Sequence, residues 1–151
     1  MHQAPTIAEE QQLIAEEFEL LDDWRERIEY VLELGKALGR LPESDYAEAN
    51  KVKGCQSQVW MVAEVDPGGR MRIRADSDAF IVKGLIALLL RLYSDRRPQE
   101  ILDNPPQVFE EIGLGAHLSP TRANGLHAMI TRIRQLATAF VHGAPATTAA
   151  S

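Results

Sequence analysis

The sequence predicts an α+β fold, in which several α-helices pack against a small antiparallel β-sheet. Apolar residues recur at helical spacing near both ends of the chain, whereas a central segment alternates as a β-hairpin does. A short run around Val52 is a candidate third strand. The chain has 151 residues, of which 45% are hydrophobic, so it can bury a core of its own.

Two helices are expected before residue 40. Thr6 followed by Glu9 has the form of a capping box, which predicts the start of the first helix. Asp23 is the expected cap of the second helix, and Gly39 and Pro42 are expected to end it.

The hairpin is expected after a polar loop over residues 43–53. Residues 59–65 are rich in β-branched and aromatic side chains, and Asp-Pro-Gly-Gly at 66–69 is a turn signal. In residues 70–75, arginine alternates with methionine, isoleucine and alanine. This alternation predicts a strand with one exposed, basic face, which serves solubility or meets an acidic partner.

Helices return in the second half. Asp78 is the expected N-cap of a helix over 79–93, which is apolar on nearly all sides and is therefore the expected central helix. Prolines open two shorter expected helices, over 98–102 and 106–112.

Ser119-Pro120 is a cap followed by a first-turn proline, and it predicts a long helix to about Val141. The residues after it are small and polar. We therefore expect one domain over 1–142 and a disordered tail over 143–151.

Composition excludes several function classes. The net charge is −6, and residues 1–48 hold thirteen of the 22 acids but only four of the 16 bases, which argues against nucleic-acid binding. No apolar run is long enough for a membrane span, and no signal peptide is visible, so a cytoplasmic protein is expected. A single cysteine excludes an intrachain disulfide and a cysteine-rich metal cage, and no metal site is expected.

The cysteine, Cys55, is the main candidate for chemistry. It lies in a polar loop after Gly54, and a thiol there is accessible to a reaction partner. Lys51 and Lys53 would favour the thiolate through their charge. The competing interpretation is that Cys55 is a small buried hydrophobic residue, which is the usual role of an isolated cysteine.

Other candidates are weaker. The four histidines, His2, His117, His127 and His142, have no sequence link to the cysteine. Asp76 and Asp78 could bind a hard cation or act as paired carboxylates, but helix capping explains them more simply.

Three blocks of sequence resemble the signature of the SufE family of cysteine desulfuration proteins. The first is Val-Lys-Gly-Cys-Gln-Ser-Gln-Val-Trp at 52–60, the second is Asp-Ser-Asp-Ala with Ile-Val-Lys-Gly-Leu over 76–85, and the third lies within 117–129. They occur in the family's order, and the likeness covers about residues 7–141.

The resemblance implies a SufE/IscU-like α+β fold and a role in a sulfur relay. A SufS-type cysteine desulfurase, which carries its own pyridoxal phosphate, would pass persulfide sulfur to Cys55. The chain itself would need no cofactor. Gly54, Gln56 and Ser57 would shape the cysteine loop, and Asp78 and Arg122 would lie near the surface that binds the partner.

In this role the chain is an accessory protein rather than a self-sufficient enzyme. It would stimulate the desulfurase and deliver sulfur to an iron–sulfur scaffold such as the SufBCD complex. A homodimer is left open. The alternatives are a CsdE-like paralogue that serves another desulfurase, a stand-alone thiol-dependent enzyme such as a peroxidase or hydrolase, and an interaction module in which Cys55 is structural.

Overall fold

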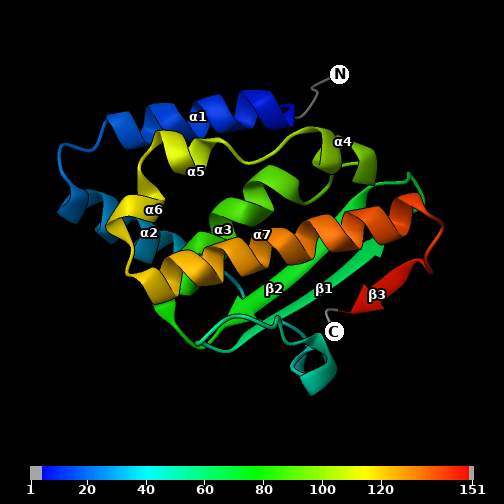
Figure 1. The fold of residues 1–151 in the computed structure, drawn as a ribbon. Coiled ribbons are helices and arrows are strands. Elements are labelled where there is room, and N and C mark those ends of the chain that lie inside the picture. The colour runs from blue at the N-terminus through cyan, green and yellow to red at the C-terminus, as the bar shows by residue number, and fades with distance from the viewer. Residues whose placement is uncertain (1–4, 150–151) are drawn as a thin grey trace.

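The predicted α+β fold is confirmed by the computed structural model, which describes residues 5–149 (Figure 1). The first helix, α1 (Ile7–Glu19), begins with the predicted capping box: Glu9 N donates to Thr6 Oγ1 and Thr6 N donates to Glu9 Oε1, each at 3.1 Å. The second helix, α2 (Trp24–Ala37), begins at Asp23, whose carboxylate accepts a backbone N–H. Both predicted caps are therefore confirmed.

The hairpin consists of β1 (Val59–Val65) and β2 (Met71–Ser77), which pair antiparallel across the predicted turn. Its buried face is formed by alternate residues of both strands. Met61 stands opposite Ala75, and Ala63 stands opposite Ile73. Together with two further buried residues they form one wall of the core: Val59, Met61, Ala63, Met71, Ile73 and Ala75.

The third strand is not the one that the sequence predicts. Around Val52 there is only an isolated bridge, in which Val52 N donates to Val59 O at 2.8 Å. The third strand is instead β3 (Thr147–Ala149), which pairs antiparallel with β1 and gives the strand order β2-β1-β3. The expectation of a disordered tail from residue 143 is therefore wrong for these residues, because the open edge of β1 offers unpaired backbone groups that local composition does not reveal. Residues 150 and 151 lie outside the described part.

The central helix is α3 (Phe80–Tyr93), whose side chains are buried on most sides, as predicted. It crosses α2 at two glycines: a Cβ on Gly84 would lie 2.0 Å from Val31 O, and one on Gly35 would lie 2.4 Å from Phe80 O. The crossing therefore brings the two backbones into direct contact. Within residues 5–149, no helix is both long and apolar enough to span a membrane.

The second half of the chain is helical, with short helices leading to one long helix. Ser119 caps the long helix through its side chain, as predicted. The expected helix over 106–112 is shorter at both ends and covers Val108–Glu111, and Gly113 in a left-handed conformation (φ 71°) separates it from the next short helix. These elements are α4 (Pro98–Asp103), α5 (Val108–Glu111), α6 (Leu114–His117) and α7 (Pro120–Val141), and two 3₁₀ turns, η1 (Glu43–Asp45) and η2 (Glu48–Asn50), fill the loop before the hairpin.

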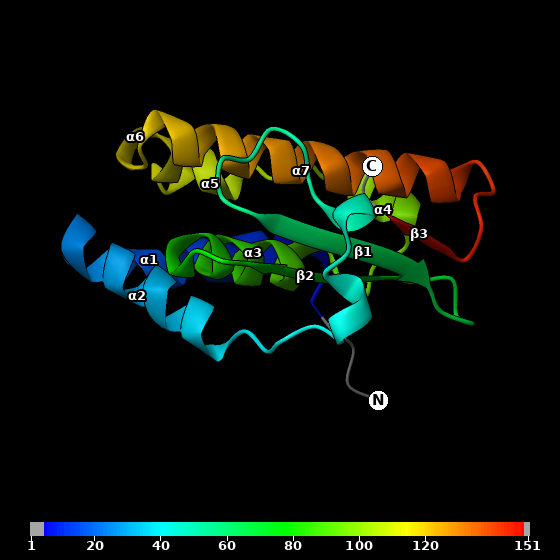
Figure 2. The same ribbon diagram turned by 90° about the horizontal axis from the view of Figure 1, so that it is seen from below.

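The arrangement in space places α7 beside the hairpin. Figures 1 and 2 show α7 running along one side of β1 and β2, with α1 and α2 on the far side of α3. The loop before β1 passes close to the N-terminal half of α7 in both views. This proximity of two segments distant in sequence creates the site described below.

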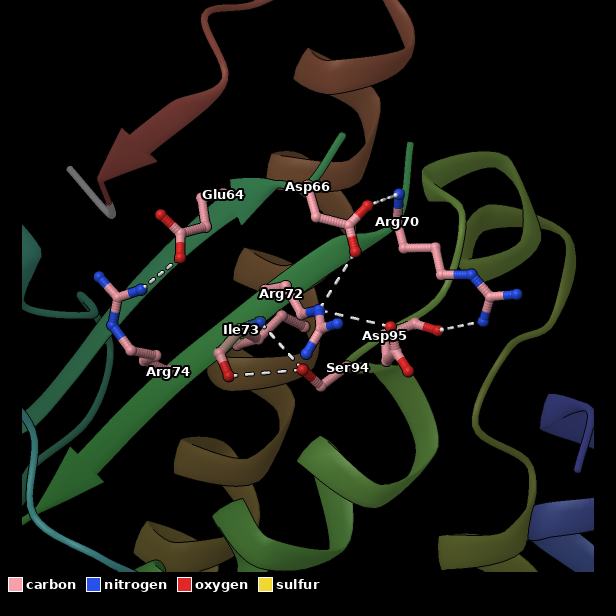
Figure 3. A network of polar contacts seen from close by, with 8 residues as sticks. All are labelled: Glu64, Asp66, Arg70, Arg72, Ile73, Arg74, Ser94 and Asp95. Atoms are coloured by element: carbon pink, nitrogen blue, oxygen red, sulfur yellow. Dashed lines mark hydrogen bonds and ion pairs between the residues drawn. The ribbon is translucent and has the colours of Figure 1, made fainter. Parts of the chain in front are cut away.

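The outer face of the hairpin is charge-balanced rather than basic (Figure 3). Arg74 forms ion pairs with Asp45 at 2.9 Å and with Glu64 at 2.7 Å, and Arg72 lies 3.3 Å from Asp66 and 3.4 Å from Asp95. The predicted basic face is therefore wrong at Arg72 and Arg74, because carboxylates from the hairpin and from other segments neutralise these two arginines, while Arg70 donates to the backbone oxygen of Asp95.

Candidate functional site

The loop that carries Cys55 is shaped by the glycine before it. Gly54 has a φ of 91°, in the region that favours glycine, and a Cβ there would lie 3.2 Å from the Cβ of Ala128 on α7. A side chain at this position would therefore be strained and would push the loop from the helix. The conformation of the loop at this position therefore favours glycine.

The Cys55 thiol points towards α7 and is half-buried. Its Sγ lies 3.6 Å from the carbonyl oxygen of Gly125, to which the thiol can donate a weak hydrogen bond. Burial raises the pKa of the Cys55 thiol, because a thiolate is less well solvated there than in water. The thiol is therefore mainly protonated at neutral pH.

The predicted activation of Cys55 by neighbouring lysines is wrong. Lys51 forms an ion pair with Glu48 at 3.0 Å, and Lys53 is exposed. Within residues 5–149, the hydrogen-bond partner of Sγ is the Gly125 carbonyl. Closeness in sequence does not bring these charges to the sulfur, and desolvation dominates.

A cavity of about 290 Å³ opens beside the thiol. Cys55, Gln56 and Ser57 border it from the loop, while Gln56 itself is exposed to solvent. Its apolar wall comes from the start of β1, from α3 and from α7, and its polar rim comes from the start of α7. The apolar residues are Val59, Val82, Leu85, Leu126 and Met129, and the polar residues are Ser119, Thr121 and Arg122.

Arg122 lines the same cavity as Cys55. Its backbone N–H donates to Ser119 Oγ at 3.3 Å, which fixes the first turn of α7. The residue is half-buried, and its guanidinium has no hydrogen-bond or ion-pair partner among residues 5–149. The site therefore holds a thiol and an unpaired cation on opposite elements.

Asp78 holds the base of the cysteine loop and does not cap α3. The N-cap of α3 is Ala79, without a side-chain hydrogen bond, because β2 continues to Ser77 and delays the helix. Asp78 Oδ1 instead accepts the Gln58 N–H at 3.0 Å, and Oδ2 lies 3.5 Å from Gln58 Nε2. The predicted cap is wrong, but Asp78 is linked to the site through Gln58.

The neighbouring carboxylate, Asp76, is structural. It is buried, accepts a hydrogen bond from Tyr46 at 2.6 Å and pairs with Lys83 at 3.0 Å. Burial alone would raise the pKa of Asp76, but the hydrogen bonds from Tyr46 and Lys83 outweigh it and hold the pKa below its ordinary value. Among the described residues, no group of three His, Cys, Asp or Glu side chains could bind a metal ion.

None of the described histidines forms a hydrogen bond with Cys55. His117 stacks on Trp24, with ring centroids 3.7 Å apart, and its Nδ1 lies 3.1 Å from Gly113 O. His127 is exposed, His142 follows the end of α7, and His2 lies outside the described residues. A Cys–His catalytic pair is therefore not formed in this structure.

Sequence reasoning missed the role of Gly125 and the cavity wall. It placed Val82 and Leu85 within the central helix and Leu126 within the long helix, without assigning any of them to a cavity. The available signal was Gly125 itself, because a glycine inside a helical pattern often marks a close approach.

The comparisons with known proteins identify the family of the chain. The family model of SufE, the Fe-S metabolism associated domain, matches residues 12–137. An uncharacterised SufE-like protein of Rhizobium etli is 46% identical over 126 residues, which cover 81% of this chain and 85% of the relative. A second from Rhizobium meliloti is 43% identical over 125 residues, covering 80% and 89%. The chain therefore belongs to the SufE family, whose domain is associated with Fe–S metabolism.

A solved structure supports the same fold. The solution structure of a hypothetical protein from Thermus thermophilus matches with a TM-score of 0.73 over 89% of this chain and 97% of that one. The sequences are 24% identical, so this likeness concerns the fold alone.

Proposed function

We propose that this protein is a cytoplasmic sulfur acceptor and carrier, which takes persulfide sulfur from a SufS-type cysteine desulfurase onto Cys55. It stimulates the desulfurase and delivers the sulfur to iron–sulfur cluster assembly, for example to a SufBCD scaffold. Membership of the SufE family supports the metabolic context. The observation that carries the proposal is the geometry of Cys55: a lone thiol on a glycine-shaped loop, beside a cavity.

The proposed transfer is thiol–disulfide exchange with a persulfide. The Cys55 thiolate attacks the outer sulfur of the desulfurase persulfide, a new S–S bond forms on Cys55, and the old S–S bond breaks. The desulfurase cysteine leaves as a thiolate, and the Cys55 proton passes to solvent. The step requires no oxidant or metal, because the sulfur arrives already in the persulfide state.

The resting thiol fits a carrier better than a stand-alone enzyme. A free-standing thiol enzyme needs a base or a cation that lowers the pKa of its cysteine. Here burial raises the pKa of Cys55, and its hydrogen-bond partner is a carbonyl. Binding of the desulfurase is expected to release the thiol from this environment.

The test is intact-protein mass spectrometry after incubation with the desulfurase and free cysteine. We expect the wild-type chain to gain one or more sulfur atoms and to lose them on reduction, while Cys55→Ser gains none. An equal gain in Cys55→Ser, or no reductant-sensitive gain in the wild type, would end the proposal. Turnover of a thiol substrate without any desulfurase would favour the stand-alone enzyme instead.

Recognition of the partner is proposed to use the surface around Arg122 and Asp78. Arg122→Ala is expected to weaken desulfurase binding about tenfold, which corresponds to about 1.4 kcal/mol, with little change in melting temperature. Arg25→Ala removes an exposed arginine of α2, and it is the matched control. Unchanged affinity and sulfur transfer in Arg122→Ala would remove this residue from the surface.

For Asp78, alanine and asparagine separate the possible roles. Asparagine keeps an oxygen that can accept the Gln58 N–H, so Asp78→Asn is expected to change desulfurase binding little. Asp78→Ala is expected to weaken binding, because the loop loses this hydrogen bond.

Assays with SufS-type and other desulfurases distinguish the proposed partner from that of a CsdE-like paralogue. The true partner is the one whose turnover the chain stimulates.

A further inference from the structure

Gly125 is the residue of α7 that faces the Cys55 thiol. It lies inside a 22-residue helix, where glycine is less favourable than alanine. Its backbone does not adopt the left-handed conformation that would call for glycine. The helix alone therefore gives no reason for glycine at this position.

The space between Gly125 and the Cys55 sulfur offers a reason for glycine at this position. A Cβ on Gly125 would lie 3.9 Å from Cys55 Sγ and, outside the neighbouring helix backbone, within 4 Å of no other atom. This distance is an ordinary van der Waals contact, so alanine is compatible with the fold and with the reduced thiol. Alanine would, however, occupy the space between the helix and the sulfur.

A persulfide needs that space. The outer sulfur lies about 2 Å from Sγ, as in a disulfide. With a methyl group in contact with Sγ on the helix side, no further atom fits between them. The outer sulfur would then have to point towards the polar rim of the cavity, where Gln56 and Thr121 are exposed to solvent.

We propose that Gly125, because it has no Cβ, leaves room inside the cavity for the outer sulfur of a Cys55 persulfide to lie against α7. This inference rests on the proposed carrier function and adds where the sulfur is stored. The apolar wall of Leu126 and Met129 then shields the outer sulfur from water-borne nucleophiles.

The experiment compares wild-type protein, Gly125→Ala and the control Gly115→Ala. Gly115 is also helical, but a Cβ there would meet nothing within 4 Å. Each protein is loaded with inorganic polysulfide: the Cys55 thiolate takes one terminal sulfur and a shorter polysulfide leaves. Cyanide then removes the outer sulfur as thiocyanate and regenerates the thiolate, and mass spectrometry follows the loss over time.

We expect Gly125→Ala to lose its outer sulfur to cyanide several-fold faster than the other two proteins. Its melting temperature should equal or exceed that of the wild type, and iodoacetamide should label its reduced thiol at the wild-type rate. Equal persulfide lifetimes in all three proteins would overturn the inference, as would a matching increase in thiol labelling, which would indicate a displaced loop.

Loading by two routes separates this inference from the proposed function. If wild-type protein is loaded by polysulfide but not by a desulfurase, the carrier proposal fails, while a difference between the glycine variants still supports storage beside Gly125. If the desulfurase loads the wild type and Gly125→Ala holds sulfur equally long, only the inference about Gly125 fails. If neither route loads the wild type, both are wrong.

Discussion

Cys55 has two lysines close in sequence and a carbonyl close in space, but burial in the surrounding protein raises the pKa of its thiol. Lys51 is paired with Glu48 and Lys53 is exposed, whereas the thiol is half-buried against Gly125. A positive charge lowers the pKa of a thiol only when it lies close to the sulfur. Desolvation raises this pKa wherever the sulfur loses contact with water. Burial therefore determines the direction of the shift.

The alkylation rate of Cys55 should report this shift. Only the thiolate reacts, and the folded-state pKa is raised, so the rate should reach half its maximum at a higher pH in the folded chain than in the same chain unfolded in urea. The unfolded chain should give a midpoint of about pH 8.5. Iodoacetamide labelling measures this directly, because the chain has a single cysteine.

A folded-state midpoint at or below that of the unfolded chain would contradict the prediction. A midpoint that falls on addition of the desulfurase would show that the partner moves the thiol out of its buried environment.

The crossing of α2 and α3 depends on a glycine in each helix. Gly84 lies where a Cβ would meet Val31 O at 2.0 Å and Val31 Cγ1 at 2.6 Å. The obstacle includes helix backbone, which cannot rotate away as a side chain can. The spacing of α3 from α2, and with it the α3 wall of the cavity, therefore depends on this glycine.

Gly84→Ala should lower the free energy of unfolding by about 3 kcal/mol or more, because overpacking against backbone forces the helices apart. Gly39→Ala is the control, since a Cβ there would meet nothing within 4 Å, and it should change stability by less than about 0.5 kcal/mol. Urea denaturation followed by circular dichroism measures both. Similar stability in the two variants would show that the crossing can relax.

The complete sheet joins the central hairpin to the last residues that the structure describes. The hairpin is local, but β3 comes from the last described residues and covers the free edge of β1, where Val65 N donates to Ala146 O at 2.7 Å. The family match ends at residue 137, so β3 lies beyond the part of the chain that defines the family. The site at the other end of β1 does not include it.

Removal of residues 143–151 should therefore leave the fold and the sulfur loading of Cys55 intact. The amide of Val65 should exchange with deuterium faster in the truncated chain, because it loses its acceptor on Ala146. The amide of Val52, which donates to Val59 at the other end of β1, is the internal control. Unchanged exchange at Val65 would show that β3 does not protect the edge in solution.

Local sequence determined most of the elements. The capping box at Thr6, the cap at Asp23, the hairpin turn at 66–69 and the Ser119 cap all rest on contacts within a few residues, so they could be predicted from neighbours along the chain. The cysteine loop was predicted for the same reason: Gly54 and Cys55 are adjacent, and their block is shared with the SufE family.

The state of the thiol and the shape of its cavity were decided by tertiary structure. Lys51 is close to Cys55 in sequence but pairs elsewhere, while Gly125 is distant in sequence and contacts the sulfur. Asp78 illustrates the same point, because its neighbours predict a helix cap, whereas packing gives it the amide of Gln58. Solvation and steric contact depend on distance in space, so these properties arise only when α7 packs against the loop.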